Sequence, residues 1–376
     1  MLAASALTGD DTGLIKKVRL QGAAGILEKK ATNIEHICGE QKRNGGVTSL
    51  CWGAEGEDTC GAGLYSGVIR FHSMEEGKGI VTEYAQAGGA PVHALRATGG
   101  PGARVVSCDA RGNVRVWAWQ AAEEQRSVES SAEAPVPIAA FQAAQTGTAA
   151  DVSADGARLV LGGRDCVPAL WCLATSTCLW KARNLPNDNL DLQVPVWESA
   201  LALSGPKMVA CATGFVAERL RGEVRIYDTS AQRRPVLRVS SVLGEEALSA
   251  LCVSADGLRV YVGSVSGNFA ALDLRRALSP LGRFKGCAGS IRAIATHATL
   301  PLVACAGLDR ALRIYDTRSF KLNERVYLKQ RLNAALFSTD GEMARASGDE
   351  GEVDEMLGLL PQVQDDALGG EVDEEG

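Results

Sequence analysis

The side chains that could do chemistry in this sequence are mainly basic groups that could hold phosphate. Lys329 and Arg331 lie in one short stretch with Lys321 and Arg325, and three further arginines precede them. Lysine and arginine are the residues with which proteins contact nucleic-acid backbones and acidic groups. We expect contacts with RNA or a partner protein from Arg292, Arg310, Arg313, Lys329 and Arg331.

Two of these arginines also have a structural interpretation. Arg310 and Arg313 flank a predicted strand, where they could pair with Asp309 or Asp316 inside the fold. An arginine held in such a pair supports a strand and does not reach a ligand. Both interpretations stay open on the sequence alone.

Residues that would catalyse a reaction or hold a metal form no recognisable pattern. The four histidines are His36, His72, His93 and His297, and the one close pair is His36 with Cys38. Metal sites need three or four ligands at characteristic spacings. The sequence also lacks the G-x-x-x-x-G-K-[ST] phosphate loop and the G-x-S-x-G turn of hydrolases. We therefore expect no enzyme activity, cofactor, metal or small-molecule substrate.

A repeated phrase indicates the elements that position the basic residues. Val-Arg-Ile-Tyr-Asp-Thr occurs at 224–229, and Leu-Arg-Ile-Tyr-Asp-Thr occurs at 312–317. Apolar residues alternate with other residues around each phrase, which indicates strands, and the Asp-Gly pairs at 155–156 and 256–257 suit tight hairpins. Strand, turn and strand ending in an aromatic residue and Asp resemble the WD repeat of β-propellers.

Length and spacing favour one closed propeller. At roughly 40–45 residues per blade, the 376 residues suffice for seven blades. Six blade cores are recognisable, and we expect the seventh to join residues 6–18 to strands at 326–328 and 333–338. The segments 21–44, 121–137 and 182–193 are expected to be loops. We predict an all-β fold, a seven-bladed WD-repeat β-propeller over residues 1–341, followed by a short acidic and mostly disordered tail over 342–376.

Charge also separates the tail from the body. Residues 342–376 hold 12 acids and one base, so the other 341 residues hold 38 bases against 33 acids, a net charge of +5. A mildly basic body permits contact with RNA or an acidic protein, and an ordinary solvated surface has the same composition. Within the tail, Val353, Met356, Leu357 and Leu360 have the spacing of one helix face. The alternatives for the tail are docking on a partner and disorder.

Cysteine usage favours a reducing compartment. The 11 cysteines form no C-x-x-C pair and stand singly in apolar strands. The first residues lack the basic and apolar regions of a secretory leader, and no apolar run approaches 18 residues. We expect an intracellular, soluble protein with no membrane partner.

Three phrases go beyond the general repeat. They are the irregular segment 184–197, which contains Leu-Asp-Leu-Gln-Val-Pro-Val-Trp; Gly-Ser-Ile-Arg at 289–292 with Gly-Leu-Asp-Arg-Ala-Leu-Arg-Ile-Tyr at 307–315; and Val-Tyr-Leu-Lys-Gln-Arg-Leu-Asn at 326–333. In this order, over residues 7 to about 338, the sequence resembles the WD-repeat large-subunit ribosome-biogenesis factors, of the WD repeat-containing protein seventy-four and Nsa-one type. Within these regions, Gly286-Cys287 stands where the common repeat has Gly-His.

This resemblance implies a function. It implies a nucleolar and nuclear assembly factor without catalytic activity, which binds pre-large-subunit ribosomal particles, contacts pre-ribosomal RNA and other assembly factors, and is released by an AAA-type ATPase. For the segment 184–197 it implies partner contacts, although Asn and Asp there could instead cap a turn. The candidate partner-binding residues are Asn187, Asp188, Leu190, Asp191 and Trp197.

The acidic end of the chain departs from the family. The family tends to end in a lysine-rich stretch, whereas this chain ends in Glu-Val-Asp-Glu-Glu-Gly. Nuclear import by its own tail is therefore in doubt, unless Lys29-Lys30 or Lys42-Arg43 takes that role.

A competing interpretation comes from a shorter motif. Asp316-Thr317-Arg318 and, less closely, Asp273-Leu274-Arg275 resemble the Asp-x-Arg ending by which some WD-repeat proteins bind the adaptor of a cullin-type ubiquitin ligase. A substrate receptor of that kind would not depend on RNA. The motif is short enough to arise by chance in many propellers.

Overall fold

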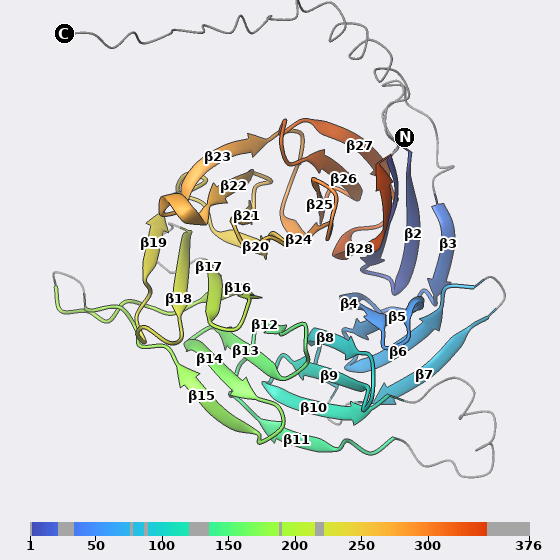
Figure 1. Cartoon of the computed structure of the whole chain (residues 1–376), viewed down its shortest axis with the longest axis horizontal. Coiled ribbons are helices and arrows are strands. Elements are labelled where there is room, and N and C mark those ends of the chain that lie inside the picture. The colour runs from blue at the N-terminus through green and yellow to red at the C-terminus, as the bar shows by residue number, and fades with distance from the viewer. Residues whose placement is uncertain are drawn as a thin grey trace, which may run out of the picture.

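Short antiparallel strands fold into a ring of blades (Figure 1), and the innermost strands line a central channel. The structure is a computed structural model, and it describes residues 2–21, 34–75, 78–85, 89–119, 135–187, 190–214 and 222–343. Over these residues the strands form seven sheets of four strands each. The seven-bladed propeller predicted from the sequence is confirmed.

Six blades use four consecutive strands, placed from the channel outward in chain order. Blades 1 to 3 consist of β4 (Val47–Gly53), β5 (Gly56–Leu64), β6 (Val68–Ser73) and β7 (Ile80–Ala85); β8 (Val92–Thr98), β9 (Arg104–Asp109), β10 (Asn113–Ala118) and β11 (Ala139–Gln142); and β12 (Ala149–Val152), β13 (Arg158–Gly163), β14 (Cys166–Cys172) and β15 (Thr177–Lys181). Blades 4 to 6 consist of β16 (Glu198–Ser204), β17 (Met208–Thr213), β18 (Glu223–Asp228) and β19 (Leu237–Ser240); β20 (Leu248–Val253), β21 (Arg259–Ser264), β22 (Phe269–Asp273) and β23 (Ser279–Phe284); and β24 (Ile291–Thr296), β25 (Leu302–Gly307), β26 (Ala311–Asp316) and β27 (Leu322–Tyr327). The short 3-10 helix η1 (Leu274–Arg276) links β22 to β23.

The seventh sheet, here called the closing blade, joins both ends of the described chain. Its order is β28 (Leu332–Met343), β1 (Leu2–Asp10), β2 (Leu14–Gln21) and β3 (Ile34–Gly39). β1 and β28 pair antiparallel, with Leu7 opposite Leu336. The indole nitrogen of Trp52 in blade 1 donates to the Phe337 carbonyl at 2.8 Å, so the closing strand is also tied to the next blade.

Two expectations about the closing blade were wrong. Residues 326–328 do not belong to it, because β27 is the outer strand of blade 6. Its outer strand is β3, which lies inside the segment 21–44 that was expected to be a loop. β3 reads Ile-Glu-His-Ile-Cys-Gly, and none of its residues is fully buried, so it gives a weak alternation signal. Of the other expected loops, 182–187 and 190–193 contain no strand, and most of 121–137 lies outside the described residues.

The apolar core consists of clusters between neighbouring blades. One joins Leu7 and Ile15 of the closing blade to Val47 and Cys60 of blade 1, and another joins Tyr261 of blade 5 to blade 6. The second strand of a blade has room only for a small side chain where the next blade packs against it. A Cβ added to Gly9 would lie 2.4 Å from Val47 Cγ1 and 2.7 Å from Val47 Cβ, too close for a side chain at this position. Apolar burial between blades therefore fixes how they are arranged in the ring.

His72 predicts a specific acid sensitivity of this core. The residue is buried in β6, and burial, followed by the charge of Arg70, lowers the pKa of its imidazole from 6.5 to about 4. Unfolded histidine binds a proton near pH 6.5, so unfolding takes up a proton between pH 6.5 and 4, and stability falls as the pH falls through that window. We expect the free energy of unfolding to fall by about 3 kcal/mol across it. Urea titrations at several pH values measure this, and the His72→Gln variant should lack this component.

Candidate functional site

The strand order places two sets of loops on one face of the ring, here called the upper face. In a four-stranded antiparallel blade, the loop after the second strand and the loop after the fourth strand leave at the same end. Backbone hydrogen bonds join these loops, as from the Leu328 amide to the Arg310 carbonyl at 2.8 Å and from the Asp165 amide to the Val196 carbonyl at 2.8 Å. Side chains on these loops therefore share one surface.

Five basic side chains lie on three upper-face loops of neighbouring blades. The loops connect β25 to β26, β27 to β28, and β3 to β4, and Figure 1 shows these strands on the side of the ring where the closing blade lies. All five side chains are exposed. We call this surface the basic arc: Lys42, Arg43, Arg310, Lys329 and Arg331.

Most of the charge on the basic arc is uncompensated. Lys42 pairs with Glu40 in its own loop. Over the part of the chain that the structure describes, the other four side chains have no ion-pair partner. Exposed and uncompensated positive charge on a rigid frame attracts a polyanion and releases its counterions on binding.

Arg310 occupies a turn position that other blades give to glycine. Its φ is +64°, and the corresponding turns after the second strand have Gly67, Gly112 and Gly267 at φ of 85°, 71° and 99°. A left-handed backbone costs a residue with a Cβ about 1–2 kcal/mol. Lys329 has the same strained conformation, with φ of 67°. Strain at exposed basic residues points to a role other than stabilising the fold.

A buried ion pair holds the loop that carries Lys329 and Arg331. The Lys16 ammonium in β2 donates to Asp10 Oδ2 and to the Leu328 carbonyl, both at 3.0 Å. Asp10 Oδ1 accepts from the Thr12 amide and the Leu14 amide, each at 3.0 Å. Both charged side chains are nearly inaccessible to solvent. The closing blade thus positions part of the basic arc.

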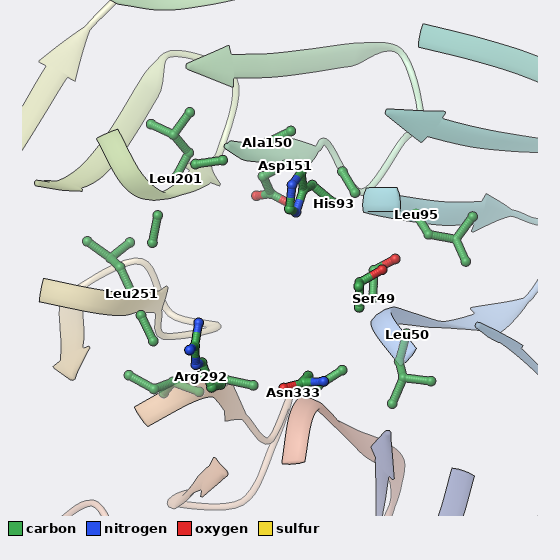
Figure 2. A pocket seen from close by; sticks show the side chains of 18 of the residues that line it. Ser49, Leu50, His93, Leu95, Ala150, Asp151, Leu201, Leu251, Arg292 and Asn333 are labelled. Carbon is green, nitrogen blue, oxygen red and sulfur yellow. The ribbon is translucent and has the colours of Figure 1, made fainter. Parts of the chain in front are cut away.

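Arg292 lies apart from the basic arc, in the central channel. The innermost strand of every blade lines this cavity of about 330 Å³. The ladders to the second strand shift register between Val92 and Ala94 and between Ile291 and Ala293. Such bulges redirect the extra side chain, and Figure 2 shows His93 and Arg292 on opposite sides of the opening.

Several polar side chains of the channel form hydrogen bonds with backbone carbonyls of the neighbouring blade. Thr148 Oγ1 donates to the Glu198 carbonyl at 2.9 Å and Ser249 Oγ donates to the Ile291 carbonyl at 2.7 Å, so these bonds tie blade 3 to blade 4 and blade 5 to blade 6. Burial lowers the pKa of His93 and raises the pKa of Asp151, so both move towards the neutral form. No three His, Cys, Asp or Glu side chains in the described segments are placed to hold a metal ion.

Arg313 lies inside blade 6 and not on a contact surface. The residue is 3% exposed and its side chain pairs with Asp309, which is the structural interpretation left open by the sequence. The first copy of the repeated phrase behaves alike: Arg225 is buried and bonds to Glu223 at 2.9 Å. The arginine of the phrase thus holds a blade together. The structure separates it from Arg310, Lys329 and Arg331.

The segment 184–197 also crosses the upper face, away from the basic arc. Asn187 Nδ2 donates to Asp191 Oδ1 at 2.9 Å, so these two residues close a local turn. Leu190 is 76% exposed. Trp197 is half-buried, with the Arg164 guanidinium 5.5 Å from its ring centre. Asp188 lies outside the described residues, as does the tail with its four apolar positions at 353–360.

The Asp-x-Arg motif lies outside the upper face. Asp316 Oδ1 accepts from the Arg318 amide at 2.7 Å and from the Ser319 amide at 2.8 Å, so the Asp-x-Arg acid closes the turn after β26.

Within the described residues, no helix is long and apolar enough to span a membrane.

Sequence reasoning did not place Lys42 and Arg43 in the site. It considered them only for nuclear import, because they are nearly 300 positions from Lys329 in the chain. Closure of the ring brings their loop beside the others: the Lys42 amide donates to the Thr12 carbonyl, and the Asp11 amide donates to the Arg331 carbonyl. The sequence signal that could have identified them is the predicted split blade, because it brings loops near the first and last strands onto the same face of the ring.

Comparison with known proteins agrees with this fold. A family model described as WD domain, G-beta repeat matches residues 278–316. The chain is 35% identical over 338 residues to WD repeat-containing protein 74 of Bos taurus, and 33% identical over 334 residues to that of Mus musculus. Each match covers 88% of this chain and 80% of the relative. The chain belongs to the WD repeat-containing protein 74 family. The family resemblance predicted from the three phrases is confirmed.

A second group of relatives matches a shorter part of the ring. Ribosome biogenesis protein NSA1 of Saccharomyces cerevisiae (strain YJM789) is 30% identical over 190 residues, which is 44% of this chain and 40% of NSA1. The similarity to WD repeat-containing protein 74 is much longer and extends well beyond the one repeat that the family model matches.

The buried pair under the basic arc predicts a large stability effect. Lys16→Met leaves Asp10 buried without its charge partner, which should lower the free energy of unfolding by about 3–5 kcal/mol. The neighbouring Lys17 is partly exposed and lies 3.8 Å from Glu35, so Lys17→Met should cost less than about 1 kcal/mol. Urea unfolding of both variants measures the difference, and equal losses would contradict the assignment.

Two variants at one position separate the strain at Arg310 from its charge. Arg310→Ala and Arg310→Gly remove the same guanidinium, but only glycine relieves the left-handed backbone. We expect the glycine variant to be more stable than the alanine variant by about 1–2 kcal/mol. Thermal or urea unfolding measures this difference. A more stable alanine variant would show that the turn is not strained.

Proposed function

We propose that this chain is a non-catalytic assembly factor for the large ribosomal subunit, which binds pre-ribosomal particles through the upper face of its propeller. The observation that carries the proposal is the basic arc, which is exposed, rigidly held and largely uncompensated, in a chain related to proteins named for ribosome biogenesis. In such a factor the ring acts as a platform, and the binding energy comes from side chains on its loops.

The basic arc suits a phosphate backbone better than a specific base sequence. Its donors are lysine ammonium and arginine guanidinium groups on separate loops, which can contact phosphates of one strand or of neighbouring helices. Pre-ribosomal RNA is the polyanion that the family resemblance implies. Arg292 could add a contact for a group that enters the channel mouth, because its side chain is exposed there.

The segment 184–197 is the proposed contact for other assembly factors. Leu190 and Leu192 are large, apolar and more than half exposed, and Trp197 lies beside them in the chain with a cation over its ring. Apolar and aromatic side chains of this kind form the centres of protein interfaces. Asn187 and Asp191 support this surface by closing its turn.

The same family resemblance supports proposals for where the protein acts and how it leaves the particle, and the sequence pattern supports a division of the chain into two parts. The protein would act in the nucleolus and nucleus, and an AAA-type ATPase would release it from the particle. Residues 1–341 would form the propeller and 342–376 the acidic tail. β28 ends at Met343, so the first two residues of this acidic segment belong to the closing blade. A substrate receptor of a cullin-type ligase is not favoured, because the Asp-x-Arg acid is engaged in its own turn.

Charge reversal tests the role of the basic arc. The variant carrying Lys329→Glu and Arg331→Glu removes two phosphate contacts and adds repulsion. We expect weaker binding to single-stranded RNA and a plot of log affinity against log salt that is less steep by about two units. Filter binding at several salt concentrations measures both.

A matched control is available at the other end of β27. Lys321 and Arg318 lie at the opposite end of this six-residue strand, roughly 20 Å from Lys329. Reversal of both control charges should leave the salt dependence unchanged. Unchanged RNA binding in the Lys329 and Arg331 variant, with an intact circular dichroism spectrum, would remove the basic arc from the proposal.

A further inference from the structure

Two thiols face each other where the chain passes from blade 5 to blade 6. Cys287 lies in the loop between β23 and β24, and Cys305 lies in the middle of β25. Their sulfur atoms are 3.2 Å apart. Cys287 holds the position that is histidine in the common repeat, so this contact replaces an imidazole by a sulfur pair.

The two thiols differ in accessibility. Cys305 is 2% exposed, whereas Cys287 is half-buried and therefore within reach of a small reagent. The phenol oxygen of Tyr315 lies 3.3 Å from the Cys287 sulfur, and its hydroxyl donates to the Lys285 carbonyl at 2.9 Å. The Ala288 amide donates to Asp309, so the loop is held on both sides of Cys287.

The surroundings also make the two thiols unequal as nucleophiles. The Cys305 thiol donates a hydrogen bond to the Cys287 sulfur and, with a smaller effect from the Arg313 charge, lowers the pKa of Cys287 from 9.0 to about 7, despite burial. The same hydrogen bond, together with burial, raises the pKa of Cys305 well above its usual value. One sulfur is thus a thiolate near neutral pH, and its neighbour keeps its proton.

We propose that Cys287 and Cys305 form a peroxide-reactive thiol pair that closes to a disulfide. The Cys287 thiolate attacks hydrogen peroxide, and the O–O bond breaks to leave a sulfenic acid and, after protonation, one water. The Cys305 sulfur then attacks the sulfenic sulfur, and the hydroxyl leaves with the Cys305 proton as a second water. Overall, two thiols and one peroxide give one disulfide and two waters.

Other thiols of the chain provide an internal comparison. Cys51 and Cys60 are both buried, on adjacent strands of blade 1. Burial raises the pKa of Cys51 to about 12 and that of Cys60 well above 9.0. They should stay reduced under conditions that oxidise Cys287, because neither supplies a thiolate. Cys178 is exposed and reports that the oxidant has reached the protein.

Peptide mapping tests this proposal on the intact chain. The folded protein is treated with hydrogen peroxide, the remaining thiols are blocked with N-ethylmaleimide after denaturation, and the protein is digested with trypsin without reductant. Cys287 and Cys305 fall in separate peptides, 286–292 and 293–310. We expect these two peptides to be joined, to lack two hydrogens, and to separate with dithiothreitol. The initial rate of joining should rise to half its maximum near pH 7.

The result that overturns the proposal is oxidation of Cys178 while peptides 286–292 and 293–310 both carry maleimide. Loss of two hydrogens at an equal rate from peptide 44–70, which holds both Cys51 and Cys60, would also overturn it, because the selectivity would be absent. As a second readout, Cys305→Ser should leave a sulfenic acid at Cys287 that dimedone traps. Cys287→Ser should leave Cys305 reduced. None of these outcomes depends on the ribosomal function proposed above.

Discussion

Pairing of β1 with β28 is the interaction on which the rest of the structure depends. It joins residues more than 320 positions apart, with Ala6 opposite Phe337 and Leu7 opposite Leu336. Without it, the ring would present two open sheet edges, each a row of unpaired backbone groups prone to pairing with other chains. The pairing also brings together apolar residues of the closing blade, blade 1 and blade 6, in two core clusters.

The candidate site follows from this closure. Arg310 comes from blade 6, Lys329 and Arg331 from the loop that enters the closing blade, and Lys42 and Arg43 from the loop that leaves it. These side chains share a face only because the first and last strands of the described chain share a sheet. The Lys16 and Asp10 pair lies inside that sheet and holds the loop between β27 and β28 in place through the Leu328 carbonyl. Fold and surface charge therefore depend on the same contacts.

Much of the fold could be predicted from local patterns. The two copies of the Arg-Ile-Tyr-Asp-Thr phrase become the third strands of blades 4 and 6, and the Asp-Gly turns become hairpins, because these depend on neighbours in the chain. The outer strand β3 was missed because an exposed edge strand needs little apolar residue content. The burial of Arg313 could not be decided, since a pairing with Asp309 and an open surface position have the same spacing in sequence. Lys42 and Arg43 required the ring to be closed first.

The central claim is that this propeller works on pre-ribosomal particles through RNA-dependent contacts. The most direct test is sedimentation of the tagged protein from cell extract through a sucrose gradient, with and without ribonuclease, with the fractions probed for large-subunit precursor RNA. The account predicts co-migration with that RNA and loss of the heavy fractions after digestion. Migration as a small complex that contains cullin components and is unaffected by ribonuclease would contradict it.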